Sequence, residues 1–155
     1  MTNLANDTKQ IDGLNDRYLL FSIDDSYYGL PLAMALEILT IQSITRLPRV
    51  APYIKGIINL RGKVIPVLDV RTKLGISERA YDDKTCIIVI DLHDMHVGLI
   101  VDMVCEVLSV PQENIIPPPK NYASYISSVS QLDDKIVLNL DCETFFQNDL
   151  EQIRV

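Results

Sequence analysis

The sequence contains one pattern twice: YLLFSIDDSYYGLPLAMALEILTIQSITRLP at residues 18–48 and IIVIDLHDMHVGLIVDMVCEVLSVPQENIIP at residues 87–117. The two copies align without a gap at an offset of 69 residues. Seven pairs are identical: Asp25/Asp94, Gly29/Gly98, Leu30/Leu99, Met34/Met103, Glu37/Glu106, Leu39/Leu108 and Pro48/Pro117. Chance would give roughly two identities over this length at ordinary residue frequencies. The match is therefore an internal repeat.

A second block repeats at an offset of 72 residues, where Ile57–Leu74 aligns with Val129–Phe146. Five more pairs are identical: Leu60/Leu132, Lys63/Lys135, Leu68/Leu140, Asp69/Asp141 and Thr72/Thr144. Each copy is the size of a small subdomain rather than of a solenoid unit. Subdomains this small are marginally stable alone, so we expect the two copies to pack against each other.

The composition indicates an acidic globular protein. The chain has 155 residues, of which 48% are hydrophobic, and its formal net charge is −7. Nucleic acids and anionic membranes both attract cationic surfaces, so the charge argues against either as the main partner. Residues 1–16 are polar, and no apolar run reaches about 18 residues. We therefore expect neither a signal peptide nor a transmembrane helix, and place the protein in the cytoplasm.

Each copy of the repeat is expected to form five short strands and a final turn of helix. β-branched and aromatic runs separated by turn residues predict two hairpins per copy. The predicted hairpins are Tyr18–Asp24 with Tyr27–Leu32, Ile57–Leu60 with Lys63–Asp69, Cys86–Leu92 with Met95–Val101, and Val129–Leu132 with Lys135–Asp141. The helical turns are expected at Arg71–Leu74 and Glu143–Phe146. Five short strands with long loops suit a small closed barrel, so the fold class is all-β: two similar barrels side by side.

The remaining strand of each copy is ambiguous from its residues. Leu32–Ile41 contains good helix formers, including Ala33 and Met34. The equivalent Val101–Val110 is rich in valine, which favours a strand. Because the two copies should share a fold, we expect a turn near Ala33–Met34 and a strand over Ala35–Ile41.

The repeat predicts a simple domain organisation. Residues 1–16 form a mobile N-terminal tail, residues 17–80 the first barrel, residues 81–147 the second barrel and residues 148–155 a C-terminal tail. Each barrel is expected to be built from a single copy.

One long motif resembles the signature of the CheW family, the coupling proteins of bacterial chemotaxis. It consists of Glu37–Ile38 followed by IKGIINLRGKVIPVLDVR at residues 54–71. The resemblance continues through Val97–Asp102 and Glu106–Leu108, and it covers roughly Arg17–Phe146. Two departures are Ala35, where the family has a larger β-branched residue, and Ser127–Ser128, where it has a glycine.

The resemblance implies a fold and a role. The fold would be two five-stranded Src-homology-like barrels. Members of the family bridge the cytoplasmic tip of a chemoreceptor, a methyl-accepting chemotaxis protein, to the histidine kinase CheA, whose regulatory domain is a similar double barrel. The chain would be an adaptor and not an enzyme. Two alternatives share the double barrel: a paralogue in another chemosensory pathway, such as type IV pilus motility, and a freestanding kinase regulatory domain.

Five residues are candidates for a receptor-binding surface: Glu37, Ile38, Asn59, Arg61 and Gly62. Arg61 is the strongest candidate. Its equivalent in the second copy is Asp133, so the fold itself does not require arginine at this hairpin tip. The resemblance places Arg61 and Glu37 in the receptor contact. Gly62 suits the positive φ of a tight turn.

The other notable residues favour structural roles. His93 and His96 form an H-x-x-H motif, but no third histidine or cysteine clusters with them, so we expect no metal site. The three cysteines, Cys86, Cys105 and Cys142, lie in apolar runs and are expected to be buried and reduced. Pro117–Pro119 is expected to stiffen a loop. No phosphate-binding loop, dinucleotide turn or nucleophile motif is present, so neither a cofactor nor catalysis is expected.

Overall fold

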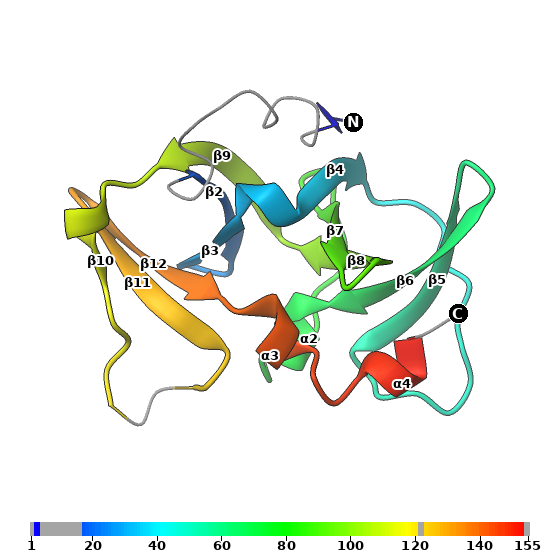
Figure 1. Cartoon of the computed structure of the whole chain (residues 1–155). Coiled ribbons are helices and arrows are strands. Elements are labelled where there is room, and N and C mark those ends of the chain that lie inside the picture. Colours follow the sequence, from blue (N-terminus) through cyan, green and yellow to red (C-terminus); the bar gives the residue numbers. More distant parts are fainter. Residues whose placement is uncertain (1, 4–16, 121–122, 154–155) are drawn as a thin grey trace.

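A computed structural model describes residues 2–3, 17–120 and 123–153 (Figure 1). Over these residues the chain forms two six-stranded sheets and helices of three or four residues. The predicted all-β class, with short helical turns, is confirmed. One sheet contains β1 (Thr2–Asn3), β4 (Ala35–Thr40), β5 (Ile54–Leu60), β6 (Lys63–Asp69), β7 (Cys86–Leu92) and β8 (Met95–Val101). The other contains β2 (Arg17–Ile23), β3 (Ser26–Pro31), β9 (Met103–Ser109), β10 (Ile115–Ile116), β11 (Ile126–Leu132) and β12 (Lys135–Leu140).

Each sheet takes strands from both copies of the repeat. The first sheet has the order β1-β4-β7-β8-β6-β5, so the β7–β8 hairpin of the second copy lies between strands of the first. The second sheet has the order β10-β11-β12-β3-β2-β9, so the β2–β3 hairpin of the first copy lies between strands of the second (Figure 1). The prediction that residues 17–80 and 81–147 each build their own barrel is therefore wrong, because the two copies exchange their first hairpins.

The pairings between the copies repeat one register. In the parallel pairs, Gly29 lies opposite Asn139 on β12, and Gly98 lies opposite Val67 on β6. These two pairs are equivalent at the sequence offsets of 69 and 72. In the antiparallel pairs, Leu20 lies opposite Glu106 and the equivalent Val89 opposite Glu37, each next to an equivalent irregularity. The exchange therefore has approximate twofold symmetry down to single residues.

Glycine allows the strands of the two parallel pairs, β3 with β12 and β8 with β6, to approach closely. A Cβ atom at Gly98 would lie 2.8 Å from a side-chain carbon of Val67, and one at Gly29 would lie 2.7 Å from Asn139 Oδ1. Real Cβ atoms do not approach other atoms so closely. The close approach of the paired strands therefore explains why both copies have glycine at this position.

Short pairings beyond β4 and β9 join the far ends of each sheet. In the first sheet, Thr45 and Ile57 exchange two backbone hydrogen bonds of 2.9 and 2.8 Å. In the second sheet, β10 pairs with β11. Each sheet therefore curls into a small barrel. Gly56 permits the first closure, because its φ is +143° and a Cβ atom there would lie 2.0 Å from the carbonyl oxygen of Thr45.

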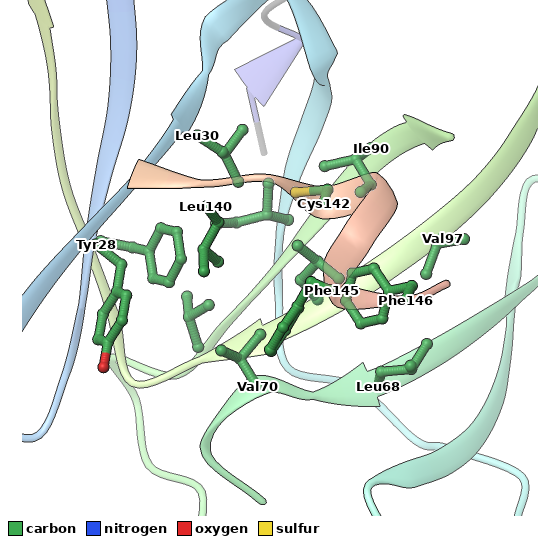
Figure 2. Packing of buried hydrophobic residues seen from close by; sticks show 14 of the residues in the cluster. Tyr28, Leu30, Leu68, Val70, Ile90, Val97, Leu140, Cys142, Phe145 and Phe146 are labelled. Atoms are coloured by element: carbon green, nitrogen blue, oxygen red, sulfur yellow. The ribbon is translucent and has the colours of Figure 1, made fainter. Parts of the chain in front are cut away.

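The main hydrophobic core lies between the two sheets. It combines buried residues such as Leu30 and Leu140 of one sheet with Leu68 and Ile90 of the other. Figure 2 shows that Phe145 and Phe146, from α3 (Cys142–Phe145) and the residue after it, point into this core. A second, smaller cluster fills the first barrel. The two copies therefore share one core.

Five short helices complete the described part of the fold. η2 (Leu32–Met34) connects β3 to β4. The prediction of a turn near Ala33–Met34 followed by a strand, rather than one long helix, is therefore confirmed. η3 (Gln112–Asn114) precedes β10. The helical turns α2 (Val70–Lys73) and α3 begin at equivalent aspartates, Asp69 and Asp141, whose carboxylates accept the backbone N–H groups of Thr72 and Thr144. These N-caps explain why both copies end in a helical turn.

The chain ends differ from the predicted tails. Within the predicted N-terminal tail, β1 pairs with β4; residues 1 and 4–16 lie outside the described part. At the C-terminus, α4 (Leu150–Ile153) packs on the first barrel, with Asp149 1% exposed and Ile153 fully buried (Figure 1). Residues 149–153 are therefore part of the folded domain, because Ile153 is buried in the core and the carboxylate of Asp149 pairs with Lys73.

Candidate functional site

The tip of the β5–β6 hairpin carries three of the five predicted site residues. Arg61 and Gly62 both have positive φ, 52° and 85°. This conformation is typical of a two-residue type I′ turn. Asn59 Oδ1 accepts the backbone N–H of Gly62 at 2.9 Å. Asn59 and Gly62 therefore shape the turn that presents Arg61, and the predicted role of Gly62 in the turn is confirmed.

An ion pair joins this tip to β4. Nη2 of Arg61 lies 2.5 Å from Oε1 and 2.9 Å from Oε2 of Glu37. The Glu37 side chain is only 7% exposed, whereas that of Arg61 is 60% exposed. The hydrogen bond to Glu37 raises the pKa of the Arg61 guanidinium. The buried carboxylate thus orients a cation whose outer face is open to solvent.

Ile38 lies beside Glu37 on β4 and is half-buried. It packs against the core between the sheets, as do the half-buried Val104 and Val107 of β9 and Met34. Strands β4 and β9 occupy equivalent positions in the two copies. Apolar side chains from both copies therefore reach the surface over the same core, and β9 is a contributor that the sequence analysis missed. Its signal was the Glu37/Glu106 identity, which aligns Ile38 with Val107.

The equivalent tip of the second barrel has a different charge pattern. Asp133 and Asp134 replace Arg61 and Gly62. Glu106, the equivalent of Glu37, is exposed, and its carboxylate lies 3.8 Å from Nζ of Lys135. Equivalent hairpins therefore present an arginine held by a buried carboxylate at one tip and two aspartates at the other. The turns themselves differ, because Arg61 and Gly62 have positive φ and Asp133 and Asp134 do not.

The fold agrees with comparisons to known proteins. The family model described as the CheW-like domain matches residues 17–150. The chain belongs to the CheW family. It is 37% identical to chemotaxis protein CheW of Bacillus subtilis over 68% of this chain and 67% of that one, and 29% identical to the Klebsiella aerogenes protein of the same name over 88% and 84%. The crystal structure of scaffolding protein TtCheW from Thermoanaerobacter tengcongensis superposes with a TM-score of 0.81 at 32% identity, covering 85% of this chain and 92% of that one.

This CheW-family chain also contains a buried arginine network. Arg71 bonds both Asp24 and Asp102, and its Nη1 donates to the carbonyl oxygen of Ser77 at 2.8 Å. Its side chain is 7% exposed. The network fixes the exchanged β2–β3 hairpin to the first barrel. Sequence analysis missed it, because Asp24 and Asp102 lie far from Arg71 in the chain.

The two histidines of the H-x-x-H motif have different partners in this CheW-family fold. His93 Nε2 lies 3.4 Å from Oε1 of Glu143, and Nδ1 of His96 lies 2.9 Å from Nζ of Lys63. Within residues 2–3, 17–120 and 123–153, no group of three or more histidine, cysteine, aspartate or glutamate residues is arranged to hold a metal ion.

The three cysteines of this CheW-family chain differ in burial. Cys142 is buried, and burial raises the pKa of its thiol to about 12. Cys86 and Cys105 are only half-buried, so the prediction of complete burial holds for Cys142 alone. Among the described residues, no helix has the length and apolar character needed to cross a membrane.

Proposed function

We propose that this chain is an adaptor that couples the cytoplasmic tips of chemoreceptors to the histidine kinase CheA in bacterial signal transduction. Membership of the CheW family supports this role. One structural observation carries the receptor part: a buried glutamate holds an exposed arginine at one barrel tip, and the twofold-equivalent tip lacks this arrangement. The proposed place of action is the cytoplasm, in receptor arrays at the inner face of the membrane.

The proposed receptor surface contains Glu37, Ile38, Asn59, Arg61 and Gly62. Arg61 would donate a charge-assisted hydrogen bond to a carboxylate or carbonyl group of the receptor. Ile38 supplies apolar area, continued by Val104 and Val107 of β9. An oriented charge beside an apolar surface is a common arrangement at the centre of protein interfaces.

The proposed kinase contacts are the outer ends of the two barrels. Val64 is 45% exposed and Ile136 is 59% exposed, and the two are equivalent positions of the repeat. Each borders an open cleft, of ≈ 540 Å³ beside Val64 and of ≈ 670 Å³ beside Ile136. Asn59 of the proposed receptor surface lies opposite Val64 and also lines the first cleft, so the two proposed surfaces adjoin at this end. Exposed branched side chains at both ends suit a protein that binds two barrels of a similar module.

The substitution Arg61→Asp tests the receptor surface. It should weaken binding of a receptor signalling-tip fragment at least about 30-fold, because a central charged hydrogen bond contributes about 2 kcal/mol or more. Binding to the CheA regulatory domain should change much less. Titration calorimetry with both partners measures this. Equal losses for both partners, or no loss for the receptor fragment, would contradict the assignment of the surface.

Two control variants separate binding from folding. Arg61→Asp leaves a buried carboxylate without its cation, so we expect it also to lower the free energy of unfolding, by an amount limited by the exposure of Arg61. The double variant Glu37→Gln, Arg61→Gln removes both charges and should fold more stably than Arg61→Asp, yet still fail to bind the receptor fragment. Asp133→Ala changes the equivalent tip and should bind it normally.

A further inference from the structure

The amino-terminal strand covers the edge of the proposed receptor surface. β1 pairs antiparallel with β4, with Thr2 opposite Ile38 and Asn3 opposite Glu37. In Figure 1 the N-terminal strand lies directly beside β4. The two residues of β4 that it faces are the two strand residues assigned to the receptor contact.

The spacing of paired strands makes this cover an obstacle. The backbones of neighbouring strands lie about 4.8 Å apart. The backbone of Thr2–Asn3 therefore occupies the space next to Glu37 and Ile38 on the open side of β4. A partner that approaches these residues along this edge must displace β1.

The second barrel shows that the fold does not need the cover. β9 is the equivalent of β4, and it is the last strand in the order of its sheet over the described residues. Its edge next to Glu106 and Val107 has no such strand among those residues. The cover is also short, because the pairing includes only two residues of β1. It can therefore open without disturbing the barrel beneath.

We propose that Thr2–Asn3 acts as a displaceable cover of β4 that competes with the receptor for the surface of Glu37 and Ile38. This inference rests on the proposed function. Only molecules with the cover open can bind the receptor, so the apparent affinity is the intrinsic affinity multiplied by the fraction of open molecules. A cover that is closed in about two thirds of molecules would weaken receptor binding about threefold.

Proline substitution tests the cover. In an antiparallel pair, adjacent residues alternate in pointing their backbone groups toward the partner strand, so one of Thr2 and Asn3 bonds β4. The double variant Thr2→Pro, Asn3→Pro removes both N–H groups and prevents the pairing. The matched control Thr2→Ala, Asn3→Ala keeps the backbone groups. Neither variant changes the residues proposed to bind the receptor.

Two measurements on the full-length variants decide the question. Because only one of the two opposed pairs is hydrogen-bonded, amide hydrogen exchange at one of Glu37 and Ile38 should accelerate, and in the proline variant only. Calorimetric titration with a receptor signalling-tip fragment should show binding about threefold tighter for the proline variant and unchanged for the alanine variant. Unchanged exchange in the proline variant would overturn the cover. Equal affinities with altered exchange would overturn the competition alone, and failure of every protein to bind would overturn the proposed function and the competition together.

Discussion

The two barrels have the same strand pairing but different chemistry at equivalent positions. Val67 of the first barrel becomes Asn139 in the second, and Ile58 becomes the buried Ser130, whose Oγ accepts a hydrogen bond from Asn139 at 2.9 Å. At the tips, Arg61 becomes Asp133. The register is preserved although both interior and tip residues change. The glycines and the apolar alternation therefore specify the pairing, and the remaining positions are available for function.

Separating the copies should have the largest effect. A fragment of residues 1–80 lacks the β7–β8 hairpin that completes its sheet, and a fragment of residues 81–155 lacks β2–β3. We expect each fragment alone to be largely unfolded by circular dichroism, and an equimolar mixture to regain the native spectrum. A fragment that folds alone into a stable monomer would show that the exchange is not needed.

Equivalent bulge positions should respond very differently to alanine. Gly56→Ala forces a Cβ atom against the backbone of Thr45 and strains a positive φ, so we expect a loss of at least about 3 kcal/mol in the free energy of unfolding. Ser128→Ala, at the equivalent position of the second copy, loses one hydrogen bond of 3.0 Å from Asn139, a loss of about 1 kcal/mol. Urea denaturation of both variants compares them. Similar losses would mean that the second closure is as tight as the first.

The ion pairs at the ends of the exchanged hairpins have opposite charge order and different burial. Arg71 bonds Asp24, whereas the equivalent Glu143 bonds the equivalent His93. Arg71→Leu should cost about 3 kcal/mol in the free energy of unfolding, because it removes the buried guanidinium that bonds Asp24, Asp102 and the carbonyl oxygen of Ser77. Glu143 is 64% exposed, so Glu143→Gln should change the stability by less than about 0.5 kcal/mol. Thermal denaturation would measure both, and a large effect of Glu143→Gln would refute the comparison.

Alkaline pH should affect one copy selectively. Lys73 of the first copy can lose a proton, whereas its equivalent in the second copy, Phe145, cannot. Lys73 donates hydrogen bonds to Asp149 at 2.6 Å and to the Tyr53 hydroxyl at 3.2 Å. Burial opposes the charge of Lys73, but these hydrogen bonds outweigh it and raise its pKa, and burial with the bond to Asp149 raises the pKa of Tyr53.

Both groups bind their protons more tightly when folded, so their contribution to stability is present below the ordinary values of 10.0 and 10.5 and is lost as the pH rises above them. Denaturation as a function of pH should show this loss in the native protein and a smaller one in Asp149→Asn. An equal loss in both would contradict the role of Asp149.

Local sequence patterns predicted most of the elements. The hairpin around His93–Asp94, the strand after Met34 and the helical turns after Asp69 and Asp141 lie within one residue of their expected bounds. In the hairpin around Arg61–Gly62, β5 begins three residues before the predicted Ile57. Alternation, turn residues and propensity act over a few neighbouring residues, so they can be read from the chain directly.

The exchange of hairpins could not be predicted in this way. Both copies present the same apolar alternation, so β2–β3 fits the sheet of either copy equally well by pattern. The pairing of Glu37 with Arg61 and the docking of Asp149 on Lys73 are likewise contacts between distant residues. Periodicity shows which face of a strand is buried, but not which strand lies beside it.

The exchange of first hairpins has a consequence for specialisation. Two separate chains, each carrying one copy, could form the same pairing only as a symmetric dimer with two identical tips. Any substitution would then appear at both ends at once. Because both copies lie in a single chain, a mutation alters one end and leaves the other unchanged. Covalent linkage thus allows one architecture to present a cationic end and an acidic end, so that the molecule has a direction in any assembly it joins.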